Sequence, residues 1–307
     1  MNTPMKLTAT AIALLLALPA CAKQPTPDQP VATKAPDPND ADPALWVVKD
    51  PDTTIYFFGT IHVLKPGLTW FDEAVKAAFD KSDQVVLELV MPDPAAMQKL
   101  VMAKGMTTAG PTLTQQLPAA KRQAFTQALT GLGLQAGAFD RMRPWLAATN
   151  LSVLPLSRLG YDTSAGPEEV LTEAAKQAGK PVIGLETAEQ QLGYFDGLSD
   201  TAQMQFLTST VDELPTLDKT MGSMVADWAA GKPDALAKEM NDSLKDSPEV
   251  AKTLLLDRNK RWAGWIENRL KQPGTVFIAV GAGHLAGGDS VQAQLLKDGV
   301  KAQRVAY

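Results

Sequence analysis

Two short apolar runs in this chain each end in a glycine that is followed, three positions later, by a histidine. The first is Phe57-Phe58-Gly59-Thr60-Ile61-His62 and the second is Ala279-Val280-Gly281-Ala282-Gly283-His284. They hold the only two histidines of the 307 residues. Apolar runs of this kind are typical of buried strands, so the motif predicts two equivalent strand ends that present their imidazoles to one place. The glycine is expected to let the chain turn sharply off the strand and to let its backbone approach the site closely.

Strand-like and helix-like segments alternate along the rest of the chain, which predicts an α/β fold. We expect a central, mostly parallel or mixed sheet, flanked by helices and carrying a helical insertion. The expected strands are 46–48 and 54–58 as a hairpin, 85–90, 181–185, 275–280 and 301–307. The expected helices are 69–82 (capped by Thr69), 94–104, 118–133, 144–158, 168–178 and 290–299, with 189–270 mostly helical and broken at Gly197, Pro215, 231–233 and Pro248.

Ligands of such sheets bind outside the carboxyl ends of the strands. His62, His284 and Glu186 are predicted at that edge, and Glu88 lies inside the apolar run 85–90 near the same end. A buried carboxylate without a partner is costly, so Glu88 should meet a metal, an arginine or backbone donors. A structural ion pair of Glu88 and a helix-capping role of Glu186 are the alternatives. Each histidine, taken singly, is equally typical of a hydrogen-bonded core or loop residue.

The N-terminal segment has the features of an export signal. Lys6 precedes an apolar stretch, 11–18, that is too short to span a bilayer and suits a signal-peptide core. The following Leu18-Pro19-Ala20-Cys21 resembles a lipobox, with an ordinary secretory signal as the alternative. We therefore expect a lipoprotein-type signal peptide at 1–20, a lipidated Cys21, a Pro-rich disordered tether at 21–44 and a folded domain at 45–307. Ala22, by resemblance to lipoprotein sorting rules, favours the outer membrane, with the domain facing the periplasm.

Composition excludes several classes of function. The net charge of −5 and the lack of any Lys/Arg block argue against nucleic-acid binding. Cys21 is the only cysteine, so once it is lipidated no disulfide, thiol nucleophile or thiolate metal site remains. The sequence 281–286 matches Gly-x-Gly-x-x-Ala, but the chain after it is too short for the βα unit that a dinucleotide site needs. No Gly-x-Ser-x-Gly and no His-Glu-x-x-His occur.

Two imidazoles and one or two carboxylates are a plausible ligand set for Zn²⁺, Mn²⁺ or Co²⁺. A three-ligand site with an open position activates water, and a remaining carboxylate can act as general base. Two other classes stay open at this point. One is a non-catalytic lipoprotein that binds haem or a peptide, for which Tyr56, Tyr161 and Tyr194 are available. The other is a metal-independent esterase that uses one histidine as base.

The chain resembles the TraB/GumN family, which includes Tiki-type metalloproteases and is related to EreA- and ChaN-like proteins. The matching stretches, in order, are 57–62, 85–90 with Glu88, Pro144-Trp145-Leu146, Gly184-Leu185-Glu186-Thr187 with Gln190, and 280–285. The resemblance implies an EreA/ChaN-like fold and a hydrolytic site with a divalent metal held by His62, Glu88 and His284. It also makes Glu88, Glu186 and Arg143 candidates for catalytic or substrate contacts. The implied activity is that of a metal-dependent hydrolase, a peptidase foremost, acting on a peptide or small ester.

Overall fold

The computed structural model describes residues 37–244 and 247–307. The predicted signal peptide, the predicted lipidation site Cys21 and residues 22–36 of the predicted tether lie outside the described residues. The compact unit begins at Asp37, so it includes residues 37–44, which the sequence analysis assigned to the tether. This segment is bound to the domain, because the Asp42 N–H donates to the Ala229 carbonyl and the Ala41 N–H donates to that of Thr69.

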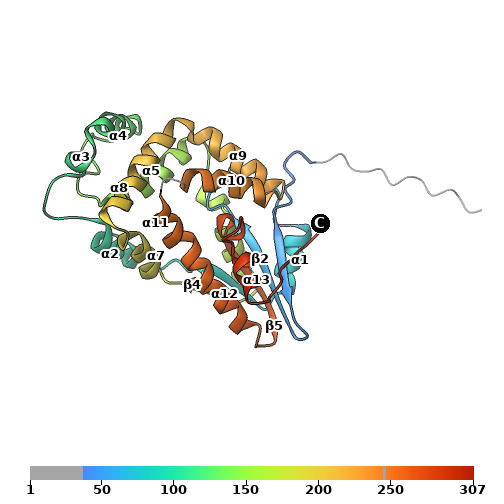
Figure 1. The fold of residues 1–307 in the computed structure, drawn as a ribbon. Helices are drawn as coiled ribbons and strands as arrows, with labels where there is room; N and C mark the ends of the chain where they lie inside the picture. Colours follow the sequence, from blue (N-terminus) through green and yellow to red (C-terminus); the bar gives the residue numbers. More distant parts are fainter. Residues whose placement is uncertain (1–36, 245–246) are drawn as a thin grey trace, which may run out of the picture. The chain divides into compact units, whose positions relative to one another are not determined.

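The centre of the fold is a mixed six-stranded sheet that does not close, with strand order β4-β3-β5-β2-β1-β6. Strands β4, β3, β5 and β2 run parallel, whereas β1 pairs antiparallel with both β2 and β6. The strands are β1 (Leu45–Lys49), β2 (Thr53–Thr60), β3 (Gln84–Leu89), β4 (Val182–Glu186), β5 (Gly274–Gly281) and β6 (Gln303–Arg304). The predicted α/β class with a mixed sheet is confirmed, as is the opening hairpin (Figure 1).

Helices cover both faces of the sheet, and each face has its own apolar core. On one face Val75 and Phe79 of α1 and Leu171 of α6 pack with alternate strand residues. On the other face Trp262 of α12 and Leu295 of α13 pack with the intervening ones. The side chains of a strand alternate between faces, and strands buried on both sides therefore read as the continuous apolar runs seen in the sequence.

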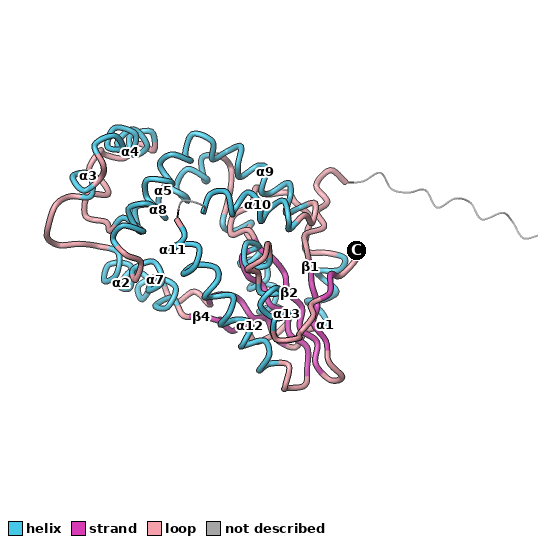
Figure 2. The backbone as a smooth tube through the Cα atoms, viewed as in Figure 1, coloured by secondary structure: helices cyan, strands magenta, loops and turns pink. Residues whose placement is uncertain are grey.

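A second group of helices lies beyond the carboxyl edge of the parallel strands (Figure 2). Its own core forms around Phe125, Leu151 and Leu207. The helices in chain order are α1 (Glu73–Lys81), α2 (Pro94–Gly105), α3 (Leu113–Gln116), α4 (Ala119–Gly131), α5 (Pro144–Arg158), α6 (Pro167–Gln177), α7 (Ala188–Asp196), α8 (Asp200–Glu213), α9 (Leu217–Ala229), α10 (Pro233–Leu244), α11 (Pro248–Ala251), α12 (Asp257–Arg269) and α13 (Val291–Lys297). A π-helical segment, η3 (Lys252–Leu256), joins α11 to α12, and the 3₁₀ turn η4 (Ala282–Leu285) follows β5.

Two local predictions were wrong, and one alternative is excluded. Helix α1 begins at Glu73 and not at Thr69, because the Thr69 backbone is hydrogen-bonded to residues 39 and 41 and is not free to enter a helix. The last strand is only Gln303–Arg304, at the outer edge of the sheet. The helix after β4 is capped by Thr187 in a capping box with Gln190, so Glu186 is not its cap.

Within the described part of the chain, no helix combines the length and the apolar character needed to cross a membrane.

Candidate functional site

The two Gly-x-x-His motifs lie side by side at one edge of the sheet. They follow β2 and β5, which are parallel neighbours with Thr60 paired to Gly281. Strand β3 flanks β5 on its other side, with Leu87 paired to Ala279, and Glu186 ends the next strand, opposite Leu89. Both histidines therefore follow parallel strands at this edge, Glu186 ends one, and Glu88 lies inside β3 one residue before its end, as the sequence predicted.

The glycines of the motifs are required for close approach and not for a sharp turn. Gly281 has φ −49° and ψ 132°, which any residue adopts, so the expected turning role was wrong. A Cβ on Gly281 would lie 3.1 Å from Glu88 Oε1 and 3.8 Å from His62 Nε2. A Cβ on Gly59 would lie 3.0 Å from the Ala282 Cα. The absence of side chains here lets the two strand ends and Glu88 come together.

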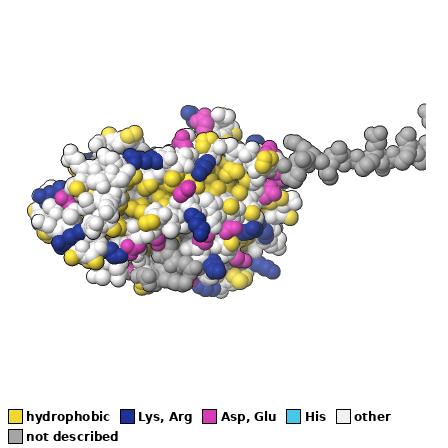
Figure 3. Space-filling view, turned by 90° about the horizontal axis from the view of Figure 1, so that it is seen from above, with side chains coloured by type: hydrophobic (Ala, Val, Ile, Leu, Met, Phe, Trp, Pro, Cys, Tyr) yellow, Lys and Arg dark blue, Asp and Glu magenta, His cyan; other side chains and the backbone are white. Residues whose placement is uncertain are grey.

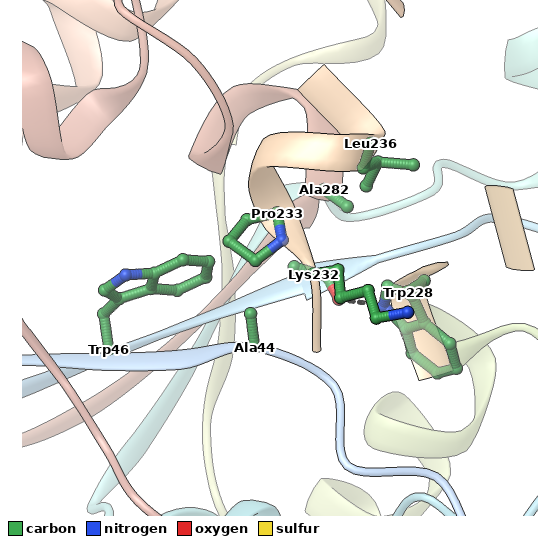
Figure 4. Close-up of a pocket in the computed structure, with 8 residues that line it drawn as sticks. Ala44, Trp46, Trp228, Lys232, Pro233, Leu236 and Ala282 are labelled. Atoms are coloured by element: carbon green, nitrogen blue, oxygen red, sulfur yellow. Dashed lines mark hydrogen bonds between the residues drawn. The ribbon is translucent and has the colours of Figure 1, made fainter. Parts of the chain in front are cut away.

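A small apolar pocket lies beside the end of β2, and Gly59 and Trp228 are among the residues that line it (Figure 4). The Trp228 indole N–H donates to the buried carbonyl of Gly59 over 2.7 Å. Trp46, Pro233 and Ala282 also line this pocket. The hydrogen bond satisfies a main-chain group that would otherwise be buried without a partner.

His62 is held by a carboxylate that the sequence analysis did not single out. Its Nδ1 lies 2.6 Å from Glu168 Oε1, which also accepts a 2.5 Å hydrogen bond from the Thr60 hydroxyl. Glu168 lies in the first turn of α6. The hydrogen bond and the charge of Glu168 raise the pKa of His62 to about 9, against the opposing effect of burial. The ring lines the cavity, and 70% of the side chain is exposed. The raised pKa favours the protonated form of this imidazole near neutral pH.

His284 is buried and neutral. Its Nδ1 lies 2.6 Å from Asn259 Oδ1, and its Nε2 lies 3.1 Å from Arg258 Nη1. Burial, together with the charges of Arg258 and His62, lowers its pKa to about 3, although Glu88 acts in the opposite direction. The Nδ1–H therefore donates to Asn259, which leaves the lone pair on Nε2 directed toward Arg258 and Glu88.

Glu88 is largely buried and ionised between these groups. Its Oε1 accepts the Gly281 N–H at 2.7 Å and lies 3.7 Å from His284 Nε2, while Oε2 accepts from Arg258 Nη2 at 2.6 Å. Burial raises the pKa of this carboxyl, but His284, Arg258, His62 and the Gly281 N–H together outweigh burial and lower it to about 2. Of the partners expected for Glu88, the structure supplies both an arginine and a backbone donor.

Glu186 lies behind Arg258 and makes its contacts there. Both of its oxygens accept from Arg258 Nε at 3.0 Å, and Oε2 also accepts from Nη2 at 2.7 Å. The indole N–H of Trp262 donates to Oε1 at 3.1 Å. Gln191 links this carboxylate to Glu88 by donating to both at 3.2 Å. Glu186 therefore acts on the site through Arg258.

Arg143 is not brought to this site. It precedes α5 and forms an ion pair with Asp196 at the end of α7. The part of α5 that reaches the site cavity starts at Ser152, nine residues or about 13 Å farther along the helix at 1.5 Å per residue. Arg143 is not among the described residues that line the cavity.

A cavity of about 810 Å³ opens in front of the strand ends. Its lining combines polar groups at and near the strand ends with an apolar wall. The polar groups are His62, Glu88, Arg258 and His284, and the apolar wall is formed by Val63, Val153, Leu156, Leu217, Met221, Met224, Leu236 and Leu255. The helices also bring Ser152, Glu213, Thr220 and Glu239 to the lining. Seen from the side on which α9 and α10 lie, the surface carries a band of hydrophobic side chains (Figure 3). The arrangement suits a substrate with apolar groups and a polar reacting group.

Sequence reasoning missed Glu168, Arg258 and Asn259. Glu168 directly follows Gly166-Pro167, at the start of a helix. Acidic residues are common at helix starts, so nothing in the sequence marks it as a site residue. Arg258 and Asn259 stand in the polar run Asp257-Arg258-Asn259-Lys260-Arg261, which is typical of a solvated helix face. Both side chains are buried because α12 packs against the sheet, which the local sequence does not reveal.

The donor groups at the strand ends fit a divalent cation. Each imidazole has its Nδ1 hydrogen-bonded to an oxygen, Glu168 for His62 and Asn259 for His284. This is how metal-binding histidines are oriented, with Nε2 left as the ligand atom. Glu88 Oε1 and His284 Nε2 are 3.7 Å apart, a separation that two ligands of one ion can have at bond lengths of about 2.0–2.2 Å. Among the described residues, no three His, Cys, Asp or Glu side chains stand together at ligand spacing, so an ion held by all three groups would require His62 to lie closer to the other two.

A buried histidine, a second histidine that faces the cavity and a carboxylate with a lowered pKa, all at the ends of parallel strands, are features typical of active sites. The chain belongs to the TraB/PrgY/gumN family, whose sequence profile matches residues 44–304. No solved structure gives a significant match.

Three relatives show how varied the matches are. The chain is similar to the uncharacterised protein YbaP of Escherichia coli (strain K12), with 30% identity over 51% of this chain and 57% of YbaP. It is 23% identical to an uncharacterised protein of Treponema pallidum (strain Nichols), over 80% of this chain and 78% of the relative. It is 26% identical to the metalloprotease TIKI2 of Danio rerio, over 90% of this chain and 62% of TIKI2. The match thus spans little more than half the length of YbaP.

Proposed function

We propose that this protein is a metal-dependent hydrolase of peptide bonds and that His62, Glu88 and His284 hold its divalent cation, Zn²⁺, Mn²⁺ or Co²⁺. One observation carries the proposal. His62 Nε2, Glu88 Oε1 and the ring of His284 all lie within 3.8 Å of the position that a Cβ on Gly281 would take. The likeness to a zebrafish metalloprotease supports a hydrolase of this kind.

The residues around the ligands have separable tasks in this proposal. The bound ion supplies a Lewis acid and an acidified water. Glu168 and Asn259 fix the tautomers of His62 and His284, so that Nε2 of each is the ligand atom. Arg258 balances the charges of Glu88 and Glu186. The apolar wall of the cavity binds the side chains that flank the scissile bond and excludes water from it.

Peptide cleavage with and without metal tests the proposal. The protein from residue 22 onward is incubated with a mixed peptide library, and products are read by mass spectrometry with Mn²⁺, Co²⁺ or Zn²⁺, or with EDTA. We expect metal-dependent cleavage that is lost in His284→Ala and Glu88→Gln and kept in Lys104→Gln, a change at a distant weak surface ion pair. Cleavage that persists in EDTA and in His284→Ala would contradict the metal mechanism.

A second candidate, a metal-independent esterase, draws on the His62–Glu168 pair. An imidazole oriented by a carboxylate is the base arrangement of many hydrolases. With its pKa raised to about 9, however, His62 is protonated at neutral pH and would act as a base only in more alkaline solution. Ester cleavage in EDTA that rises through about pH 9 and is lost in His62→Ala would favour this candidate.

We also propose that the domain is tethered by a lipid on Cys21 to the outer membrane and faces the periplasm. The support is the sequence alone: the apolar segment 11–18, the lipobox-like Leu18-Pro19-Ala20-Cys21, and Ala22 after it. Labelling with a palmitate analogue in a bacterial host should mark the wild-type chain and not Cys21→Ser. Equal labelling of both would contradict the proposal.

A further inference from the structure

One cation is already part of the site, because the guanidinium of Arg258 lies between the two inner metal-ligand candidates. Its Nη1 lies 3.1 Å from His284 Nε2, and its Nη2 lies 2.6 Å from Glu88 Oε2. Arg258 is only 8% exposed. Since Nδ1 of His284 is engaged by Asn259, the lone pair that receives Nη1–H is the one a metal ion would use.

A separate set of contacts would retain Arg258 if those two hydrogen bonds were lost. Glu186 accepts from Nε at 3.0 Å and from Nη2 at 2.7 Å. The guanidinium also lies over the Trp262 ring, 4.7 Å from its centroid. Nε and one edge of the group are thus fixed by Glu186 and Trp262, whereas Nη1 is held by His284 and by the Leu254 carbonyl at 3.3 Å. The contact to His284 uses the atom that a metal would need, and the contact to Glu88 Oε2 neutralises the carboxylate whose other oxygen, Oε1, is the proposed ligand.

We propose that Arg258 is the resident cation of the metal-free site, and that a divalent ion displaces it from Glu88 and His284 while Glu186 retains it. The inference rests on the proposed function, because it takes His284 and Glu88 as ligands. It follows from charge and lone-pair count. His284 Nε2 has one lone pair and serves either Arg258 or the ion, and two cations next to one carboxylate repel each other. Arg258 thus keeps the empty site charge-balanced and lowers its affinity for metal.

Displacement also gives Arg258 a place in substrate binding. The residue lines the cavity, and the release of His284 frees the Nη1 hydrogen bond for an oxygen of the substrate. A guanidinium suits a carboxylate or a carbonyl oxygen. The metal-loaded protein would therefore bind substrate at Arg258, and the metal-free protein would not.

Metal affinity of Arg258→Gln tests the inference, with Arg261→Gln as the matched control. Arg261 lies in the same helix 3.8 Å from Glu186 and over the Tyr194 ring, and its side chain is 48% exposed. Dissociation constants for Mn²⁺ and Co²⁺ are measured by competition with a fluorescent chelator on the protein from residue 22 onward. We expect about tenfold tighter binding in Arg258→Gln, equivalent to about 1.4 kcal/mol, and no change in Arg261→Gln. Binding in Arg258→Gln that is equal to or weaker than wild type would overturn the inference.

The same measurements separate this inference from the proposed function. If Arg258→Gln binds metal and wild type binds none, Arg258 competes with the ion for Glu88 and His284, and the proposed metal-dependent function is contradicted. Binding by wild type that does not tighten in Arg258→Gln leaves the proposed function standing and overturns the inference. Binding by neither protein overturns both.

The wild-type protein provides a second readout in case Arg258→Gln does not fold. With only two histidines in the chain, long-range ¹⁵N–¹H spectra resolve the Nε2 of His284 without ambiguity. On adding diamagnetic Zn²⁺, we expect the His284 Nε2 and the hindered Arg258 Nη signals to shift together. A shift of His284 Nε2 with the Arg258 signals unchanged would overturn displacement.

Discussion

Glu168→Gln should reduce the number of protons that the protein releases when it binds a divalent ion. In the proposed site the ion needs the neutral Nε2 of His62, whose pKa is raised to about 9 by the hydrogen bond and charge of Glu168. His284, with a pKa of about 3, and Glu88, with a pKa of about 2, are already deprotonated. Metal binding near neutral pH therefore has one ligand proton to expel, and that proton is on His62.

The expected size of the effect follows from these pKa values. At pH 8 a group with a pKa of about 9 is roughly 90% protonated, so wild type should release about 0.9 proton from His62 per ion. Glu168→Gln removes the charge that raises the pKa of His62, so this pKa should fall toward the ordinary value of about 6.5, at which less than about 0.1 of His62 is protonated at pH 8. The difference between wild type and Glu168→Gln should be about 0.8 proton.

Calorimetry in two buffers of different ionisation enthalpy measures this proton count. The difference between the two proteins removes any proton released by metal-bound water. Glu169→Gln is the matched control, because Glu169 is the exposed neighbour of Glu168 in the same helical turn. Equal proton release by wild type and Glu168→Gln at pH 8 would refute the assignment of His62 as a ligand oriented by Glu168.

Four further predictions concern the metal-free protein and the shape of the site. The ion pair with Glu168 raises the pKa of His62 in the folded protein to about 9, so the stabilisation by this pair should be full below about pH 6.5 and fade as pH rises through about 9. In urea unfolding across this range, the unfolding free energies of wild type and Glu168→Gln should converge above pH 9. Glu186→Gln removes one of the two carboxylates that pair with buried Arg258, the other being Glu88, and should cost about 1–3 kcal/mol of unfolding free energy. Exposed Glu189→Gln should change this free energy by less than about 0.5 kcal/mol. Trp228→Phe leaves the Gly59 carbonyl buried without its donor and should cost about 1–3 kcal/mol, and an unchanged denaturation midpoint would show that water replaces the indole. Gly281→Ala places a methyl group 3.1 Å from Glu88 Oε1 and should weaken metal binding, measured by chelator competition, while the protein stays folded. A metal affinity equal to that of wild type would contradict the close packing of the site.

Much of the fold was readable from the chain because local signals and packing agree. Helix α5 spans Pro144–Arg158, the range predicted from its pattern, because Pro144 is preorganised for a first turn and Trp145, Ala148 and Leu151 give it a buried face. The runs that became β3 and β5 are mainly apolar, with Glu88 as the exception within β3, since both faces of these strands are covered. The start of α1 was misplaced because Thr69 has a tertiary hydrogen-bond partner near Asp40, which no local pattern reveals.

Site residues of a rare type could be predicted from the sequence, whereas site residues of a common type could not. Two histidines with the same spacing stood out, and so did a glutamate within an apolar strand. Arg258 carries no such mark, because an arginine in a charged helix segment usually faces solvent. Its burial depends on Glu88 and Glu186, which are brought within 2.6 Å and 2.7 Å of its Nη2 by strands 70 or more residues distant in sequence. Arg143 shows the opposite error. Its place beside the matching stretch Pro144-Trp145-Leu146 made it a candidate, but it lies at the end of α5 that is far from the site.

In the proposed site, the ends of β2, β3 and β5 bring His62, Glu88 and His284 together around one cation. Metal stoichiometry tests this proposal most directly, by elemental analysis of the protein from residue 22 onward after equilibration with Mn²⁺, Co²⁺ or Zn²⁺ and removal of free ions. We predict about one ion per chain in wild type and none in His62→Ala or His284→Ala, with both variants folded by circular dichroism. A wild-type protein that stays free of all three metals, or a His284→Ala protein that retains a full equivalent, would contradict the account.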